Sequence, residues 1–133
     1  MNWDNLVAAL LAEIADVPEI AAIVGSRVVF ASEGAPYVVP GIEATIISDT
    51  VDELWEPVTI QFDLFGRDFA EVRTLERILR GRYHKQLPIP IGGLNVWAQY
   101  SDGTVLASPG RDKFFGRAIR FTFTPLRAAY TGG

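Results

Sequence analysis

The most constraining feature of this chain is a change of hydrophobic period within residues 58–83. In residues 58–64 apolar and polar side chains alternate one by one, which is the period of a half-buried β-strand. Gly66 ends this pattern, and from Asp68 onward the apolar residues recur about every 3.6 positions, as on one face of a helix. The apolar residues of that face are Phe69, Val72, Leu75, Ile78, Leu79 and Tyr83. A strand therefore leads into a helix, and we expect the helix to pack on the sheet that the strand joins.

Two helices are predicted before the first strand. A first helix begins after a cap at Asn2 or Asp4, carries apolar residues at i, i+3 and i+4 spacing, and ends near Asp16. Pro18 suits the first turn of a second, short helix, and Gly25 suits its C-terminal end.

Two further strands are predicted before residue 58. Residues 27–31 are rich in β-branched side chains, which favours a strand, and residues 32–36 predict a turn. A second strand runs from Tyr37 to Ser48 with an interruption at 40–41. Because a proline cannot donate a ladder hydrogen bond, we expect this interruption at a sheet edge or a bulge. Residues 48–57 are polar and acidic, and we expect them to form a loop.

After the central helix, residues 86–93 contain prolines and glycines that exclude a helix and fit an extended connector. Residues 94–100 predict a strand, and the Asp-Gly pair at 102–103 predicts a hairpin turn into a short strand. Residues 119–124 alternate as a last strand, and we expect residues 126–133 to be a loose tail.

The predicted fold is therefore α+β, in the order α-α-β-β-β-α-β-β-β, with a mostly antiparallel or mixed sheet and the helices packed on it. A chain of 133 residues is long enough for one hydrophobic core and too short for two, so residues 1–133 are expected to form a single domain.

The composition limits the compartment and the type of site. The chain has no cysteine, which excludes disulfides and thiolate metal sites and favours a reducing cytoplasm. Its first basic residue is Arg27, and it has no run of 18 apolar residues, so we expect neither a signal peptide nor a membrane span. Hydrophobic residues make up 49% of the chain, with a mean hydropathy of +0.19. For so small a protein, this predicts apolar surface that partners bury.

The charges are unevenly distributed along the sequence. Residues 1–65 hold eleven acidic residues and one basic residue, whereas residues 66–133 hold eleven basic and five acidic residues, which gives the net charge of −4. Two interpretations follow. Surfaces of opposite sign could meet between copies of the chain, or the two halves could interleave in the fold so that their charges mix.

Residue patterns typical of catalysis are not found. His84 is the only histidine, so a site with two histidine ligands is impossible. At the end of the central helix it is expected to complement the helix dipole, with a catalytic base as the alternative. Ser26 follows a helix and precedes a strand, the reverse of a nucleophile elbow, which favours a turn serine.

Two other motifs are also weak. Asp49, Asp52 and Glu53 are close enough in sequence to contact a hard cation, but their spacing differs from that of a calcium loop, which favours solvated carboxylates. The glycines at 92–93 lack a following Lys-Ser or Lys-Thr, so a phosphate loop is unsupported. The sequence therefore predicts no catalytic residue, no metal site and no cofactor.

Arg73, Arg77 and Arg80 lie in a narrow arc of the central helix beside its buried face. Three interpretations are open. They could grip a phosphate or carboxylate ligand, they could contact the acidic half of a neighbouring subunit, or they could form a solvated face through pairs with Glu76. Nucleic-acid binding is disfavoured by the sequence pI of about 4.9.

Four segments carry a resemblance to a known family. They are A-D-V-P-E-I-A-A-I-V-G-S-R-V at 15–28, A-P-Y-V-V at 35–39, S-D-T at 48–50 and V-T-I-Q-F-D-L-F-G-R-D-F-A-E-V-R-T-L at 58–75. Together they resemble the small tail-terminator or tail-completion proteins of long-tailed bacteriophages. The resemblance covers most of the chain up to Tyr83, and the chain departs from the family pattern at residues 40–57.

The resemblance implies a structural virion protein and not an enzyme. Such proteins form a ring, typically of six copies, that caps the tail tube, ends its polymerisation and provides the docking surface for the head–tail connector. The implied partners are the chain itself, the major tail tube protein and the connector protein, with DNA passing through the lumen without specific binding. The implied location is the head-proximal end of the tail in the virion, and the host cytoplasm during assembly. The net acidic charge suits a channel through which DNA passes.

On this hypothesis Arg73, Arg77 and Arg80 contact a neighbouring subunit. The loops at 49–56 and 102–113 contact the tube or the connector. The candidate contact residues in these loops are Asp49, Asp52, Glu53, Trp55, Arg111 and Lys113.

The sequence leaves three alternatives open. A connector or stopper protein of the phage neck would differ mainly in the neighbour it touches. A small enzyme or ligand-binding domain would need a pocket that joins His84 with Asp49 or Glu53. A host protein module would use its opposite charges only within the chain.

Overall fold

The computed structural model describes residues 3–31, 39–47, 57–106 and 115–126 of the 133-residue chain. Within these ranges the elements, in chain order, are α1 (Trp3–Ala15), α2 (Pro18–Val24), β1 (Val28–Phe30), β2 (Gly41–Ile46), β3 (Val58–Gly66), α3 (Phe69–Tyr83), β4 (Ile89–Ile91), β5 (Leu94–Leu106) and β6 (Phe115–Pro125). The predicted α+β fold and its order of elements are confirmed.

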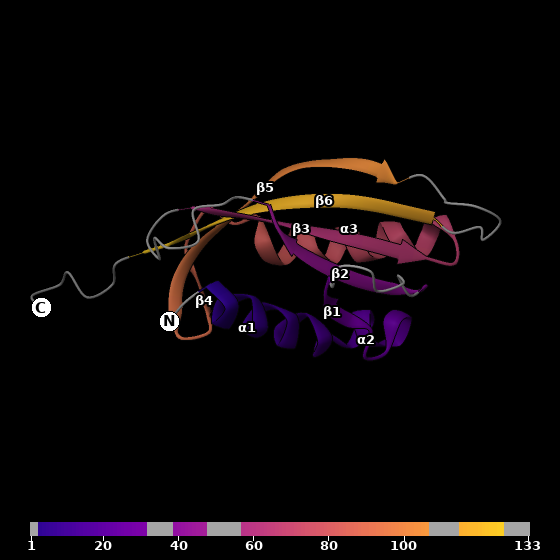
Figure 1. Ribbon diagram of the computed structural model, residues 1–133, viewed down its shortest axis with the longest axis horizontal. Helices are drawn as coiled ribbons and strands as arrows, with labels where there is room; N and C mark the ends of the chain where they lie inside the picture. The colour runs from indigo at the N-terminus through magenta and orange to yellow at the C-terminus, as the bar shows by residue number, and fades with distance from the viewer. Residues whose placement is uncertain (1–2, 32–38, 48–56, 107–114, 127–133) are drawn as a thin grey trace, which may run out of the picture.

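The strands form one six-stranded sheet in the order β1-β2-β3-β6-β5-β4 (Figure 1). The β1–β2 pair is parallel and the other pairs are antiparallel, so the sheet is mixed. β3 and β6 pair along the full length of β3, from Val58 opposite Phe123 to Gly66 opposite Phe115. This central ladder gives the domain a long axis with two distinct ends.

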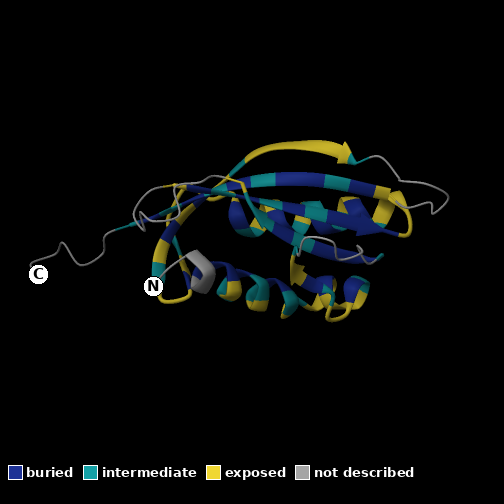
Figure 2. Cartoon of the chain, in the orientation of Figure 1, coloured by how far each residue is buried: buried dark blue, intermediate teal, exposed yellow. Residues whose placement is uncertain are grey.

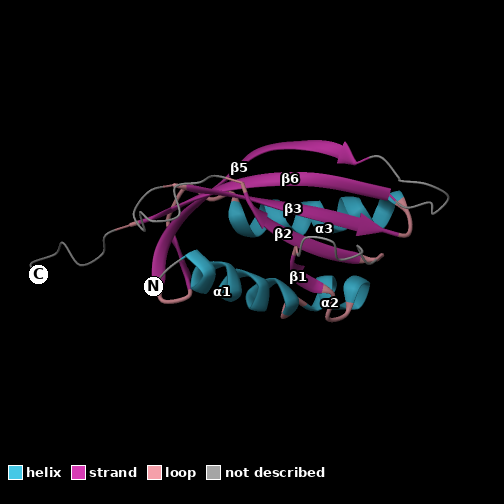
Figure 3. Ribbon diagram, in the orientation of Figure 1, coloured by secondary structure: helices cyan, strands magenta, loops and turns pink. Residues whose placement is uncertain are grey.

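All three described helices lie on the same side of the sheet (Figure 3). α3 packs against the central strands β3, β6 and β5, whereas α1 contacts β1 and β4, the outermost strands of the sheet. Because one helix touches both edges, the sheet must curve around the helical layer. Its opposite face carries no helix among the described residues (Figure 1).

The hydrophobic core fills the space between the helices and the inner face of the sheet (Figure 2). In β3 the predicted alternation is confirmed, since Val58, Ile60, Phe62 and Leu64 are buried. At the centre, the ring of Phe121 contacts that of Phe62 edge to face, with 5.9 Å between centroids. Such pairs add to the free energy gained by burying the rings themselves.

The buried face of α3 consists of Val72, Leu75, Leu79 and Tyr83. The prediction that Phe69 belongs to this face is wrong, because 56% of its surface is exposed. Phe69 is the first residue of α3.

The predicted hairpin turn at Asp102-Gly103 is also wrong. β5 continues through both residues and stays paired with β6, with a register shift between Tyr100 and Asp102. Pairing along the length of β6 overrides the local turn preference of an Asp-Gly pair. A Cβ atom at Gly103 would lie 2.7 Å from Tyr100 Oη and 2.7 Å from an Arg117 guanidinium nitrogen, which are both ends of flexible side chains.

The actual hairpin lies in the segment predicted as an extended connector. Gly92 and Gly93, with φ of 57° and 83°, join β4 to β5, and Ile91 pairs with Leu94. Glycine accepts these positive φ angles at little cost, and a two-residue Gly-Gly loop is a hairpin signal. Pro90 is tolerated because β4 is an edge strand.

Pro40 does not mark a sheet edge, contrary to prediction. It immediately precedes β2, which pairs with β1 on one side and β3 on the other. The Pro40 carbonyl accepts a hydrogen bond from Arg27 Nε at 2.6 Å, so this proline lies where the chain enters the sheet. Residues 48–56 of the predicted loop at 48–57, the start of the second strand at 37–38 and residues 127–133 of the predicted tail at 126–133 lie outside the described residues. Leu126, the first residue of that tail, is tied to β5, because its N donates a hydrogen bond to Asn95 O at 2.8 Å.

Candidate interaction surface on helix α3

The start of α3 is fixed by a compact turn after β3. Asp68 caps the helix, and its Oδ1 accepts a hydrogen bond from Glu71 N at 2.9 Å. Glu71 Oε1 accepts in return from Arg67 N at 2.8 Å, and the Arg67 guanidinium lowers the pKa of Glu71. Gly66 permits the tight approach, because a Cβ there would lie 2.8 Å from a Val72 methyl carbon. These contacts set the position of the first two turns of α3 relative to β6.

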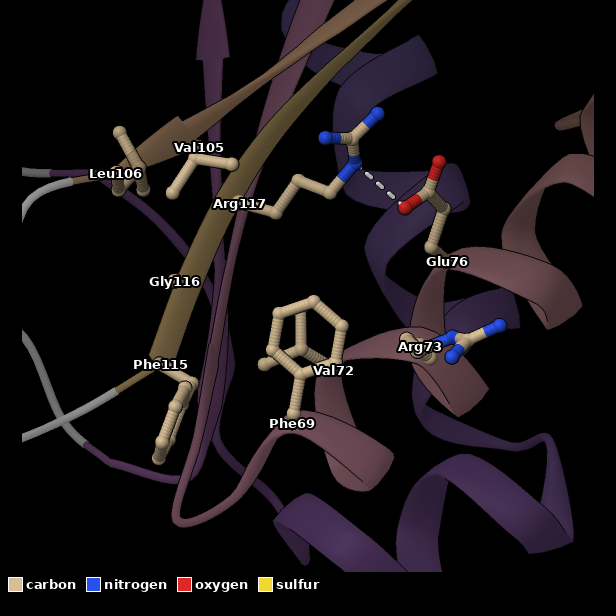
Figure 4. Close-up of a pocket in the computed structure, with 9 residues that line it drawn as sticks. All are labelled: Phe69, Val72, Arg73, Glu76, Val105, Leu106, Phe115, Gly116 and Arg117. Carbon is tan, nitrogen blue, oxygen red and sulfur yellow. Dashed lines mark ion pairs between the residues drawn. The ribbon is translucent and has the colours of Figure 1, made fainter.

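A pocket of about 280 Å³ lies between these turns and the adjoining ends of β5 and β6 (Figure 4). We call it the α3 pocket. Its lining residues are Phe69, Val72, Arg73, Glu76, Val105, Leu106, Phe115, Gly116 and Arg117.

The apolar side chains around the α3 pocket are unusually exposed. Val105 is 70% exposed, Phe69 56% and Phe115 44%. The rings of Phe69 and Phe115 meet edge to face with 6.1 Å between centroids. Isolated exposed apolar residues are ordinary, but a cluster of them around a concavity is typical of a contact or ligand-binding surface.

The charged residues at the pocket differ in how they are paired. Glu76 Oε1 lies 2.6 Å from Arg117 Nε, and Glu76 Oε2 lies 3.6 Å from the Arg80 guanidinium. The Glu76 side chain is only 14% exposed, whereas the Arg117 and Arg80 side chains are 30% and 49% exposed, so only the carboxylate of this group is largely shielded from water. Arg73 has no carboxylate within ion-pair distance among the described residues, and its guanidinium lies 6.0 Å from the centroid of the Phe69 ring. Arg73 therefore supplies an available positive charge at the rim.

The row of arginines predicted on α3 is present, and its members have different surroundings. Arg73, Arg77 and Arg80 line, with Glu76, an open groove of about 390 Å³. Arg77 lies 3.5 Å from Glu19 of α2, with both side chains exposed. Such an exposed pair contributes little to stability.

Arg80 is the most engaged of the three. Its guanidinium lies 4.1 Å from the centroid of the Tyr100 ring and pairs with Glu76, as the sequence predicts. These contacts within the chain favour the solvated-face interpretation for Arg77 and Arg80. Arg73 is the member best placed to meet another molecule.

Two ion pairs bear on the uneven charge distribution. Glu13 pairs with Arg82 at 3.1 Å and Glu19 with Arg77 at 3.5 Å, and each pair joins an acid of the first half to a base of the second. The described contacts thus favour interleaved charges. Glu13 Oε1 also accepts a hydrogen bond from Tyr83 Oη at 2.9 Å, and burial raises the pKa of Tyr83 well above its ordinary value. This cluster ties α1 to α3.

The open face of the sheet carries two neighbouring carboxylates. Glu43 of β2 lies directly opposite Asp63 of β3, and burial together with the Asp63 charge raises the pKa of Glu43. Burial also raises the pKa of Asp63, opposed by its hydrogen bond from Gln61 and the charge of Arg120. Gln61 Nε2 donates to Asp63 at 2.8 Å, and Arg120 Nε donates to Gln61 Oε1 at 2.9 Å. This polar row crosses the middle of the face.

His84 has a structural contact. It caps the end of α3, and its Nδ1 accepts a hydrogen bond from Tyr100 N at 3.0 Å, which ties the helix end to β5. Among the described residues, no group of three or more histidine or acidic side chains is arranged to hold a metal ion. Ser26 lies in the turn between α2 and β1, where its carbonyl accepts from Val28 N at 2.9 Å.

The predicted tube or connector contacts cannot be compared with the α3 pocket directly. Asp49, Asp52, Glu53, Trp55, Arg111 and Lys113 all lie outside the described residues. The sequence interpretation missed Val105 and Phe115 as members of an interaction surface. A possible signal is the Phe-Phe pair at 114–115, which adjoins a polar, charged segment.

No protein-family model matches the chain, and no curated protein matches it. In the part of the chain that the structure describes, no helix has both the length and the apolar character needed to cross a bilayer.

Proposed function

We propose that this protein is a phage tail terminator. Copies of the chain form a ring, typically hexameric, on the head-proximal end of the tail tube, where the ring ends tube polymerisation and presents the surface that receives the head–tail connector. The proposal joins the resemblance of residues 15–75 to one structural observation, the exposed apolar α3 pocket. In this role the chain acts by contact with other proteins, without catalysis or a cofactor.

The α3 pocket carries the proposal because of what it exposes. Phe69, Phe115 and Val105 present apolar surface to water around a concavity, with Arg73 at the rim. Aromatic residues, including phenylalanine, and arginine are enriched at protein interfaces. A ring also requires heterologous contacts, in which one patch meets a different patch on the next copy, and a pocket at one end of the domain suits such a contact.

The electrostatics are compatible with a DNA channel. The chain has a net charge of −4, and Glu43 and Asp63 lie together on the open face of the sheet. Acidic walls repel phosphates, so DNA would pass without binding. Arg73, the available member of the arginine row, is the proposed contact with a neighbouring subunit. The protein would reside in the virion after assembly in the host cytoplasm.

The test is to incubate the purified chain with purified tail tubes and image them by electron microscopy. We expect a ring at one end of each tube. Arg73→Glu should weaken this binding, and Lys85→Glu, the same charge reversal at an exposed residue beyond the other end of α3, should leave it unchanged. Tubes that stay bare at both ends would contradict the proposal, and binding only to isolated head connectors would indicate a stopper protein of the neck instead.

A further inference from the structure

We infer that the α3 pocket of one copy receives residues 48–56 of a second copy, with Trp55 in the pocket and neighbouring carboxylates against Arg73. The inference rests on the self-assembly proposed above and names the two surfaces that meet. It places Trp55 against a neighbouring copy, whereas the sequence hypothesis placed it against the tube or connector.

The α3 pocket defines the chemistry of its occupant. Its walls are mostly apolar, from Phe69, Val105 and Phe115, which favours an apolar side chain. Arg117 is already paired with Glu76, but Arg73 at the rim has no carboxylate within ion-pair distance among the described residues. An occupant that combines a large apolar group with a negative charge would therefore satisfy both features.

One segment of the chain has this combination. Residues 48–56 contain four carboxylates together with Leu54 and Trp55. The other internal segments outside the described ranges, 32–38 and 107–114, contain one carboxylate each, and the C-terminal residues 127–133 contain none. Charge complementarity with Arg73 thus selects residues 48–56.

This segment cannot reach the pocket of its own chain. Its flanking residues lie at one end of the central ladder, where Ile47 N donates to Thr59 O and Val58 pairs with Phe123. The pocket lies at the other end, where Gly66 pairs with Phe115. The eight residue steps from Val58 to Gly66 span about 26 Å at the rise of a β-strand.

The length of chain available is much shorter than that distance. Trp55 is two residues from Pro57, the next described residue, so its Cα lies at most about 7 Å from that of Pro57. The Trp55 side chain is much shorter than the rest of the distance from Pro57 to the pocket. A pocket filled by Trp55 must therefore belong to another copy.

The contact would be heterologous, because the residues that flank the segment and the residues that line the pocket lie at opposite ends of the central ladder. Each copy then offers its segment to one neighbour and its pocket to another. Such contacts close into a ring when the rotation between copies permits, and otherwise extend into a filament.

Cross-linking tests the inference in the full chain, because the protein has no native cysteine. We would introduce Glu56→Cys and Val105→Cys together and treat the chain with a short bismaleimide. The expected product is a ladder of dimers and larger species. The matched control replaces Val105→Cys with Val29→Cys, another exposed valine, which lies on the edge strand β1 and should give no ladder.

Two further substitutions test the chemistry of the contact. Adding Trp55→Ala or Arg73→Glu to the cysteine pair should lower the yield of cross-linked species roughly tenfold, as expected for an interface anchor. Circular dichroism melting of each variant establishes that it remains folded. A ladder that persists in both variants would overturn the inference. A closed loop within one chain, or no cross-link from the Glu56→Cys, Val105→Cys pair, would also overturn it.

The experiments can distinguish a failure of the pocket contact from a failure of the terminator role. If the ladder forms as expected and the protein ignores tail tubes, the pocket contact stands and the terminator role fails. If rings form on tubes and Trp55→Ala leaves them unchanged, the terminator role stands and this contact is wrong.

Discussion

Two groups of edge-to-face aromatic rings lie at opposite ends of helix α3, and they differ mainly in burial. At the C-terminal end, Tyr83 packs on Phe121 and Phe123 with centroid separations of 6.1 and 5.8 Å, and all three residues are fully buried. At the N-terminal end, Phe69 and Phe115 are 6.1 Å apart, but they are 56% and 44% exposed. The two groups of rings therefore have similar geometry, but folding removes much more apolar area from water at the Tyr83 end than at the Phe69 end.

This difference separates residues that hold the fold from residues available to another molecule. The free energy gained by burial scales with the apolar area removed from water, so the Tyr83 end contributes most to stability. There α1 also reaches α3, through the hydrogen bond from Tyr83 to Glu13. At the Phe69 end, apolar surface stays exposed to water in the folded chain. A partner that covers this surface would gain the free energy of its burial.

The largest expected effect is loss of the buried ring. Phe121→Ala should lower the free energy of unfolding by about 3–5 kcal/mol, because it leaves a cavity beside Phe62, Tyr83 and Phe123. Phe115→Ala, its exposed counterpart, should cost roughly 1 kcal/mol or less, as expected for a half-exposed ring. Urea denaturation of both variants measures the difference. Equal losses would mean that the two ends of α3 contribute alike.

A second prediction concerns the turn that positions the exposed end. Gly66→Ala should destabilise the fold by about 1–3 kcal/mol, because its Cβ would overlap a Val72 methyl carbon and approach Asp68 O at 3.1 Å. Since the same contact places Phe69, tube binding should weaken in parallel. Gly81→Ala is the control, because a Cβ there meets nothing within 4 Å. Unchanged stability of Gly66→Ala would show that the turn relaxes freely.

A third prediction concerns the cap of α3. Asp68→Ala should cost about 1 kcal/mol, since it removes the side-chain acceptor for Glu71 N. Asp68→Asn retains an oxygen acceptor and should restore most of that loss. Thermal unfolding of the two variants checks both statements, and an Asp68→Ala variant as stable as the parent would show that the cap contributes nothing.

The smallest effect is expected on the open face of the sheet, away from both aromatic groups. Burial and the mutual charge raise the pKa of Glu43, and burial raises that of Asp63, so ionisation of this pair opposes folding at neutral pH. Glu43→Gln should stabilise the protein by about 0.2–1 kcal/mol at pH 7, as expected for relief of like charges directly opposite in a sheet.

The pH dependence gives the sign of this effect. A carboxyl whose pKa is raised by folding destabilises the fold above that pKa, and the loss is recovered as the pH falls through it toward the ordinary carboxyl pKa of about 4. The gain from Glu43→Gln should therefore shrink as the pH is lowered over this window. Denaturant titrations at several pH values measure it, and a gain that grows on acidification would contradict the assignment.

The sequence predicted features that depend on local periodicity. The strand that begins at Val58, the helix after Asp68 and the second helix between Pro18 and Gly25 are confirmed, because amphipathic period and capping residues act within a few positions. Gly66, which was predicted to end the strand, is its last residue. It failed where long-range pairing decides the outcome. Asp102-Gly103 has a turn preference, but the continuous ladder with β6 keeps it in a strand.

The α3 pocket could not be predicted for the same reason. Val105 and Phe115 are far from Phe69 in sequence and meet it only through the pairing of β5, β6 and β3. The helical wheel placed Phe69 among the buried residues because a wheel gives only the direction in which a side chain points. It does not show whether the sheet covers that position of the helix. Arg73 was selected from the sequence with Arg77 and Arg80, but only their contacts distinguish the available charge from the paired ones.

We propose that the Phe69 end of α3 serves contact with other proteins and contributes little to holding the fold. The most direct test is co-sedimentation of the double variant Phe69→Ser, Phe115→Ser with purified tail tubes, alongside urea denaturation of the same sample. We expect a free energy of unfolding within about 1 kcal/mol of the parent, as for exposed substitutions, and at least tenfold weaker tube binding. Binding as tight as that of the parent, in a variant that remains folded, would contradict it.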